Sequence, residues 1–117
     1  MNIDILMATY NGEKYIENQI LSLQQQTHKN WILYIRDDGS TDSTLEILEN
    51  FSKNDNRIKI IKDSLGCNLG AGKNFLTLTK YSLSEYVIFC DQDDIWFERK
   101  LELLLKFMLE KILNTHC

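Results

Sequence analysis

The sequence of 117 residues predicts an α/β fold in which a Rossmann-like, mostly parallel sheet is flanked by helices. Short apolar runs alternate with longer stretches whose apolar residues recur at helical spacing, which is typical of βαβ units. The length suits one domain with a single core. Right-handed crossovers then place the carboxyl ends of all strands at one edge of the sheet.

The first half of the chain contains two predicted strand–helix pairs. Residues 3–8 and 31–36 read as buried strands, and Trp31 begins the second of them. Each is followed by a predicted helix, over residues 13–26 and 43–53. The residues that mark the apolar faces of these helices are Ile16, Ile20, Leu23, Leu45, Leu48 and Phe51.

Polar residues precede both helices and predict how they start. Asn11 suits the N-cap of the first helix, and Glu13 would lie in its first turn, where negative charge is favourable. Ser43 and Glu46 have the spacing of a capping box at the start of the second helix.

The second half repeats the alternation. Residues 57–62 and 85–90 read as strands, and a glycine-rich loop, residues 66–72, opens a third helix that extends through about Ser82. The last predicted helix covers about residues 98–113. The residues expected to bury its apolar face are Leu101, Leu104, Leu105, Met108 and Ile112.

Composition and charge limit the partners and the location. A net charge of −4 leaves no basic surplus for nucleic acid, so we expect no nucleic-acid partner, and a phosphate ligand should arrive with a metal ion. The three cysteines, Cys67, Cys90 and Cys117, lack C-x-x-C spacing, which favours a reduced, cytoplasmic setting. No export signal or transmembrane segment is expected. Peripheral attachment at the inner membrane face is kept open.

Three polar turns leave predicted strands at the same sheet edge. They are Thr9–Gly12, Asp37–Ser40 and Asp91–Asp94. Because open α/β sheets bind ligands at the carboxyl ends of their strands, we expect these turns to converge on a ligand site.

The turn Asp91–Asp94 carries three carboxylates within four residues. Such carboxylates repel one another unless a cation or a hydrogen-bonding ligand compensates them. Hard oxygen ligands suit Mg²⁺ or Mn²⁺, which commonly bridge a protein carboxylate to phosphates. A calcium loop of the EF-hand type is excluded, because Trp96 stands where that loop needs glycine. A solvated acidic turn is the alternative.

The other two conspicuous loops each have two interpretations. Asp37 and Asp38 could simply form a turn and helix cap, but a second carboxylate at this edge can also accept the ring N–H of uracil or thymine. The glycine-rich loop lacks the G-x-G-x-x-G spacing of dinucleotide binders. It is either a plain loop or a tight loop that brings Asn68 and Lys73 to a ligand.

Some residues are expected to lie outside the site. Arg36 and Lys14 are predicted to be solvated. Trp96 and Phe97 are expected to pack under the acidic turn, and Cys90 is expected to be a small buried hydrophobe.

Five motifs, in order along nearly the whole chain, resemble the donor-binding half of family 2 glycosyltransferases of the GT-A fold. They are Met7-Ala8-Thr9-Tyr10-Asn11-Gly12-Glu13, Gln26-Thr27, Arg36-Asp37-Asp38-Gly39-Ser40-Thr41-Asp42, Asn68-Leu69-Gly70 through Lys73-Asn74, and Cys90-Asp91-Gln92-Asp93-Asp94-Ile95-Trp96. The last motif looks most like a bacterial rhamnosyltransferase-like branch that builds surface polysaccharides.

The resemblance implies metal-dependent, inverting transfer of a sugar from a UDP- or dTDP-sugar donor to a saccharide or lipid-linked saccharide acceptor. Residues 1–117 would form the nucleotide-sugar-binding part, with the acceptor part absent. In the family, the carboxylate base comes from a later segment, so it is expected beyond Cys117 and no residue here is nominated as catalytic. We therefore expect an incomplete donor-binding fragment.

The resemblance also implies roles for individual residues. The residues that would bind the nucleotide sugar are Thr9, Tyr10, Glu13, Asp38, Lys73 and Asp91. The residues that would hold the Mn²⁺ or Mg²⁺ ion are Asp93 and Asp94. Within the first set, Asp38 would accept a hydrogen bond from the pyrimidine, and Asp91 would lie near the ribose or donor sugar. Lys73 stands where many relatives carry Arg, whose two-pronged contact a lysine does not reproduce.

Two other functions remain open from the sequence. One is a non-catalytic α/β interaction module that self-associates as a homo-oligomer, because a sheet ending at its fourth strand exposes an edge. The other is a metal-dependent phosphatase or nucleotidyltransferase, which would use the acidic turn differently.

Overall fold

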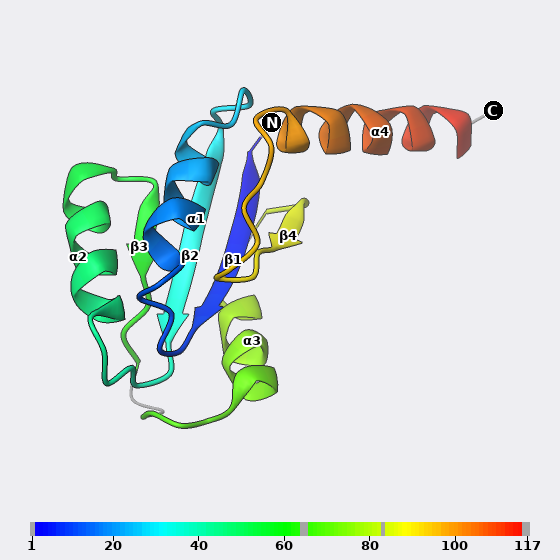
Figure 1. Cartoon of the computed structure of the whole chain (residues 1–117). Coiled ribbons are helices and arrows are strands. Elements are labelled where there is room, and N and C mark those ends of the chain that lie inside the picture. The colour runs from blue at the N-terminus through cyan, green and yellow to red at the C-terminus, as the bar shows by residue number, and fades with distance from the viewer. Residues whose placement is uncertain (1, 64–65, 83, 116–117) are drawn as a thin grey trace.

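The computed structural model describes the backbone of residues 2–63, 66–82 and 84–115, with side chains up to residue 111. Four parallel strands form one sheet in the order β3-β2-β1-β4, with helices packed around it (Figure 1). This confirms the predicted α/β architecture. The strands are β1 (Ile3–Thr9), β2 (Trp31–Asp37), β3 (Ile58–Ile60) and β4 (Val87–Phe89), and the helices are α1 (Ile16–Gln24), α2 (Thr44–Asn54), α3 (Ala71–Thr79) and α4 (Lys100–Thr115).

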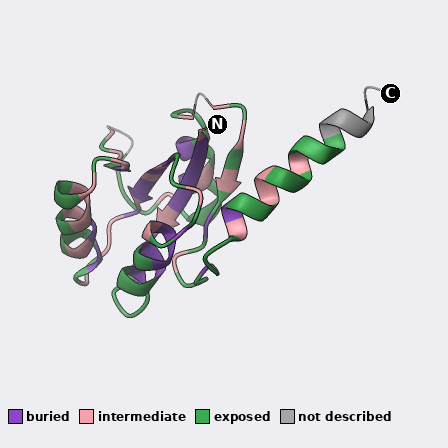
Figure 2. Cartoon of the chain, turned by 90° about the horizontal axis from the view of Figure 1, so that it is seen from above, coloured by how far each residue is buried: buried purple, intermediate pink, exposed green. Residues whose placement is uncertain are grey.

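The core lies around β1 and β2, which pair over their full seven residues. Alternate side chains of a strand point to opposite faces of the sheet. On one face, Ile3, Ile5 and Met7 of β1 join a buried cluster with the apolar residues of α1 and with Leu48 of α2. On the other face, α3 packs against β1 and β2 and buries Leu78. Figure 2 shows burial concentrated in the two central strands.

The two outer strands are shorter than predicted. β3 and β4 have three residues each. Each lies at an edge of the sheet and so has only one strand to pair with. Hydrogen bonds from Ile61 to Ile35 and from Cys90 to Leu6 still fix the chain where each edge strand ends.

The predicted helix starts were wrong in detail. Asn11 adopts a left-handed conformation (φ 48°), and α1 begins at Ile16 without a side-chain cap. At α2, Ser43 makes no capping hydrogen bond with its side chain. Asp42 performs this function instead, because its Oδ1 accepts from the Thr44 amide at 2.9 Å. Asp42 also accepts from the Glu13 amide at 3.2 Å, so the residue that caps α2 is held in place by the loop after β1.

The burial predicted for the last helix was confirmed in part, whereas the burial predicted for Phe97 was wrong. Only Leu101 is fully buried, whereas Leu104, Leu105 and Met108 are half-buried. The side chain of Ile112 lies outside the described residues. The helix α4 runs away from the sheet, so most of its length has no body of the protein to pack on (Figure 1).

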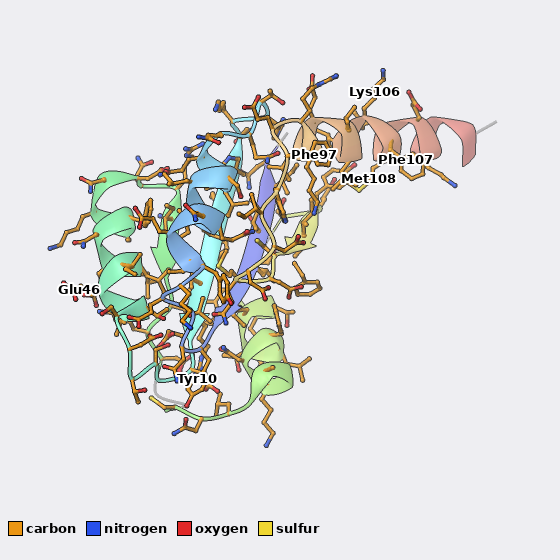
Figure 3. All side chains as sticks on the ribbon, in the orientation of Figure 1. Tyr10, Glu46, Phe97, Lys106, Phe107 and Met108 are labelled. Atoms are coloured by element: carbon orange, nitrogen blue, oxygen red, sulfur yellow. The ribbon has the colours of Figure 1, made fainter. Side chains whose placement is uncertain are left out.

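Before this helix, Trp96 is buried in the core as predicted, with 4% of its surface exposed, but Phe97 is 61% exposed (Figure 3). In the part of the chain that the structure describes, we find no helix with the length and apolar character needed to cross a membrane.

Candidate functional site

A hollow of about 550 Å³ lies at the carboxyl ends of the strands, where the polar turns after β1, β2 and β4 meet. This volume is in the range of small-molecule sites. Its lining residues are Ala8, Thr9, Tyr10, Asp38, Asn68, Gly70, Ala71, Asn74, Phe75, Asp91, Gln92 and Asp93. The structure thus brings together five residues predicted for the site, and Figure 3 shows Tyr10 beyond the end of β1.

The loops after β1 and β2 are joined by hydrogen bonds. The Asn11 side chain accepts from the Thr41 amide at 2.8 Å, and the Asn11 amide donates to the Ser40 hydroxyl. The Gly12 amide donates to the Thr44 hydroxyl at 2.8 Å. These bonds link residues about thirty positions apart, so they hold together the two loops that carry Thr9, Tyr10 and Asp38 to the hollow.

Asp37 and Asp38 have separate roles. Asp37 holds its own turn, since its carboxylate accepts from the Ser40 amide at 2.8 Å and from the Ser40 hydroxyl at 2.6 Å. The Thr9 hydroxyl also donates to Asp37, at 2.8 Å. Asp38 reaches across to the glycine-rich loop instead, and its two oxygens accept from the amides of Leu69 and Gly70 at 2.8 and 2.9 Å. Asp38 is 6% exposed and lines the hollow, and each of its oxygens keeps a lone pair that the glycine-rich loop does not use.

Arg36 is not solvated as predicted but is 3% exposed beneath the site. Its guanidinium donates twice to Asp63, at 2.9 and 3.1 Å, and once to the Asn74 side chain at 3.0 Å. It also donates to the Gly66 carbonyl at 2.7 Å and lies 3.6 Å from Asp38. The hydrogen bond to Asp63 is the main cause that raises the pKa of Arg36. One signal in the sequence pointed to this role, namely an arginine directly before two aspartates at a strand end.

The carboxylates of the acidic turn are exposed. Asp91 and Asp93 line the hollow and are exposed, whereas Asp94 is not among the lining residues. Among the described side chains, none donates a hydrogen bond to these three carboxylates. Within the same residues, no three His, Cys, Asp or Glu side chains gather closely enough to hold a metal ion by themselves. Two free carboxylates do match the usual magnesium arrangement, in which substrate phosphates and water supply the other ligands.

Gln92, which the sequence interpretation passed over, anchors this turn. Its carboxamide accepts from the Tyr10 amide at 3.1 Å and donates to the Tyr10 carbonyl at 3.2 Å. Beneath the turn, Cys90 is buried as predicted, and burial raises the pKa of its thiol to about 12. A thiol with such a pKa is protonated near neutral pH and is a poor nucleophile.

Two predicted residues lie away from the hollow. Lys73 lines a separate depression of about 290 Å³ along α3, together with Leu76 and Lys80. The Glu13 carboxylate accepts from the Ser43 amide at 3.0 Å, so it stabilises the start of α2. The structure therefore brings neither side chain together with the other predicted residues.

The position of the catalytic base was predicted from the family resemblance alone. The base was expected beyond Cys117, and Cys117 itself lies outside the described residues. The expectation that residues 1–117 supply no catalytic carboxylate therefore stays a prediction.

The profile of the family described as Glycosyl transferase family 2 matches residues 4–112. The dTDP-rhamnosyl transferase RfbG of Shigella flexneri is 43% identical over 99 residues, which cover 82% of this chain and 34% of that protein. The UDP-Glc:alpha-D-GlcNAc-diphosphoundecaprenol beta-1,3-glucosyltransferase WfgD of Escherichia coli is 38% identical over 109 residues, covering 92% of this chain and 41% of that protein.

Among solved structures, S. aureus TarS 1-349 in complex with UDP-GlcNAc superposes with a TM-score of 0.82 at 31% identity. This match covers 94% of the chain and 32% of TarS 1-349. The chain thus spans 32% to 41% of the length of these three proteins.

Proposed function

Because the chain belongs to glycosyl transferase family 2 and has the GT-A fold of TarS, we propose that its hollow binds a nucleotide diphosphate sugar for transfer to a saccharide acceptor in polysaccharide synthesis. The observation that carries the proposal is the meeting of three polar turns around one hollow of about 550 Å³. Family membership also disfavours the phosphatase and nucleotidyltransferase interpretations.

The donor is proposed to be a UDP- or dTDP-sugar. The names of two relatives support this class, one being a dTDP-rhamnosyl transferase and the other using UDP-Glc. The TarS structure that holds UDP-GlcNAc supports it as well. The nucleoside would lie against Thr9 and Tyr10. Asp38 would accept from the ring N–H with the lone pairs that the glycine-rich loop leaves unused.

The diphosphate is proposed to lie toward Asp91 and Asp93, with a divalent cation between these carboxylates and the phosphates. A Mn²⁺ or Mg²⁺ ion there would supply Lewis-acid stabilisation of the charge on the leaving diphosphate. Asp93 would be its main protein ligand, and Asp91 would lie toward the ribose or sugar. The metal role of Asp94 and the ligand roles of Lys73 and Glu13 stay predictions, since all three lie outside the lining of the hollow.

Residues 1–117 are proposed to act as the donor-binding part of the transferase, with direct, inverting displacement at the sugar. This chain's own groups would bind and orient the donor. We nominate none of its Asp or Glu residues as the base that takes the acceptor's proton. That base is proposed to lie beyond Cys117, in the part of the relatives' length that this chain does not span.

Calorimetric titration tests the proposal. UDP-GlcNAc, UDP-glucose and dTDP-rhamnose are titrated into the protein with Mn²⁺ and again with EDTA. GDP-mannose, whose nucleobase is a purine, is the control for recognition of the pyrimidine. Asp93→Asn should weaken the metal-dependent binding by roughly tenfold or more, whereas Glu110→Gln on exposed α4 should leave it unchanged. Absence of heat with all of these donors in the presence of Mn²⁺ would contradict the proposal.

A second candidate is a non-catalytic module that self-associates. The exposed apolar side chains along β4 and α4 favour it, among them Phe89 and Phe107, each 57% exposed. Large exposed apolar surfaces commonly mark interfaces. Analytical ultracentrifugation distinguishes the two, because a strict monomer over a wide concentration range eliminates this candidate.

A further inference from the structure

The side chain of Gln92 joins the two halves of the hollow. It belongs to the acidic turn after β4, yet both of its polar atoms bond to the backbone of Tyr10 after β1. The Gln92 Nε2 atom donates to the Tyr10 carbonyl, and the Gln92 Oε1 atom accepts from the Tyr10 amide. A carboxamide is the side-chain group that can make this complementary pair with one residue's backbone.

The Gln92 carboxamide also lies close to the backbone of Gly12 in the same loop. A Cβ atom built at Gly12 would clash with the Gln92 carboxamide, whose Cδ would lie only 2.7 Å away. The Gly12 backbone is not in the left-handed region, so an alanine there would not strain the backbone and would instead displace the end of the Gln92 side chain. Among the described residues, the other three side chains of the acidic turn make no hydrogen bond.

We propose that Gln92 is a positioning residue that couples the Tyr10 loop to the acidic turn, so that nucleoside binding and metal-assisted diphosphate binding reinforce each other. This inference rests on the proposed function. If Tyr10 is ordered by a nucleoside, the paired carboxamide fixes the turn that presents Asp91 and Asp93. Linkage then requires that the metal strengthens nucleotide binding by the same factor that the nucleotide strengthens metal binding.

Without the pair, each half would keep its own groups but lose its fixed distance to the other. Misplacing binding groups that must act together weakens the combined interaction more than either separate one. The quantity that Gln92 controls is therefore the gain in nucleotide affinity caused by Mn²⁺, rather than nucleotide affinity itself.

The test is a double-mutant cycle with Gln92→Ala and Gly12→Ala. The dissociation constants of UDP and dTDP are measured with and without Mn²⁺, and their ratio is the metal gain. Each single variant should lower this gain roughly fivefold, the factor of about one net hydrogen bond. The double variant should lower it no further, because both changes break the same pair. Gln25→Ala, an exposed glutamine at the end of α1, is the matched control and should keep the full gain.

A second measurement needs no ligand. Exchange of the Tyr10 amide proton, followed by NMR, should be faster in Gln92→Ala and unchanged in Gln25→Ala. Gln92→Glu keeps the size of the side chain and can accept from the amide but cannot donate to the carbonyl. It should therefore lower the metal gain by no more than Gln92→Ala does while the fold persists, which separates positioning from loss of structure.

The outcomes are distinct. Faster Tyr10 exchange with an unchanged metal gain overturns the inference, because the pair would then be only structural. Additive losses in the double variant overturn it as well, since coupling would run through other residues. If the unsubstituted chain binds neither nucleotide in the presence of Mn²⁺, the proposed function fails and takes the inference with it.

Discussion

The flank of the hollow formed by β1 and β2 rests on two seven-residue strands, whereas the flank formed by β4 rests on a strand of three residues. On the first flank the loops are joined by hydrogen bonds, and the acids have partners. On the second flank three carboxylates are exposed, and the turn is anchored through Gln92. The comparison indicates that one flank provides stability and the other provides charge.

This division follows from electrostatics. Carboxylates that are already paired are poor metal ligands, and unpaired ones repel and cannot hold a turn together. A site that must receive a cation with its phosphates therefore needs a weakly held acidic flank beside a firmly held one. The predictions below test that asymmetry.

The largest effect is expected at Arg36 on the stable flank. Arg36→Ala removes the buried guanidinium that joins Asp63, Asn74 and the Gly66 carbonyl. Breaking a buried pair of this kind should lower the free energy of unfolding by about 3–5 kcal/mol. Urea denaturation measures it. Arg99→Ala, which removes an exposed pair with Glu102, is the matched control and should change stability little. Equal losses in both variants would contradict the asymmetry.

The next effect concerns local opening of the β4 flank, which is followed by the rate at which the Cys90 thiol is labelled. Its thiol is fully buried, so labelling requires the flank to open. We expect this opening to cost about 1–2 kcal/mol less than global unfolding. Peptide mass spectrometry of maleimide labelling at increasing urea measures it, with exposed Cys67 as the fast reference. A Cys90 rate that follows global unfolding at every urea concentration would remove the distinction between the flanks.

A smaller effect is expected from Asp55, between α2 and β3. Hydrogen bonds from Arg57 hold the pKa of Asp55 below its ordinary value of 3.8. A lowered pKa in the folded state stabilises the protein above pH 3.8, and this contribution is lost as pH falls through the folded-state pKa. Asp55→Asn should therefore be less stable than the unsubstituted chain by about 1 kcal/mol at pH 7.

The difference in the free energy of unfolding between Asp55→Asn and the unsubstituted chain should shrink toward pH 2. Denaturation at successive pH values measures it. Asp93→Asn serves as the comparison from the acidic flank and should be no less stable than the unsubstituted chain at pH 7. A loss for Asp93→Asn as large as that for Asp55→Asn would show that both flanks use their acids structurally.

The smallest effect on stability is expected at Phe107 on α4, which projects from the body of the protein (Figure 3). Phe107→Ser should change the free energy of unfolding by less than about 0.5 kcal/mol, because the side chain is largely exposed already. Thermal denaturation measures this. Leu101→Ser at the buried start of α4 is the contrasting variant and should be strongly destabilising. A large loss at Phe107 would indicate packing of α4 in a dimer.

The architecture was predictable because its signals are local. Apolar periodicity along 13–26 and 43–53 identified both helices of the stable flank, and the strand beginning at Trp31 was confirmed. Burial of Cys90 and Trp96 was also correct. The errors fell where contacts between loops compete with local rules. Asn11 bonds to the Thr41 amide instead of capping α1, and Asp42, which also accepts from the Glu13 amide, caps α2 in place of Ser43.

The site was predictable in part. Topology alone brought Thr9, Tyr10, Asp38, Asp91 and Asp93 to one edge, because parallel strands end together. The side of α3 on which Lys73 lies was not predictable. A shift of one residue in the start of the helix would turn this side chain toward or away from the hollow. The hydrogen-bond partners of the site residues were not predictable either. They depend on which residues from distant parts of the sequence are brought together by folding.

The sequence by itself determined the order of strands and helices and the placing of an acidic turn at a strand end. Both follow from the spacing of apolar and polar residues within one segment. Only the tertiary structure decided that Arg36 is buried with Asp63, that Asp38 holds the glycine-rich loop, and that Gln92 pairs with Tyr10. These contacts join residues 27 to 82 positions apart, and no local pattern encodes a distance that folding alone creates.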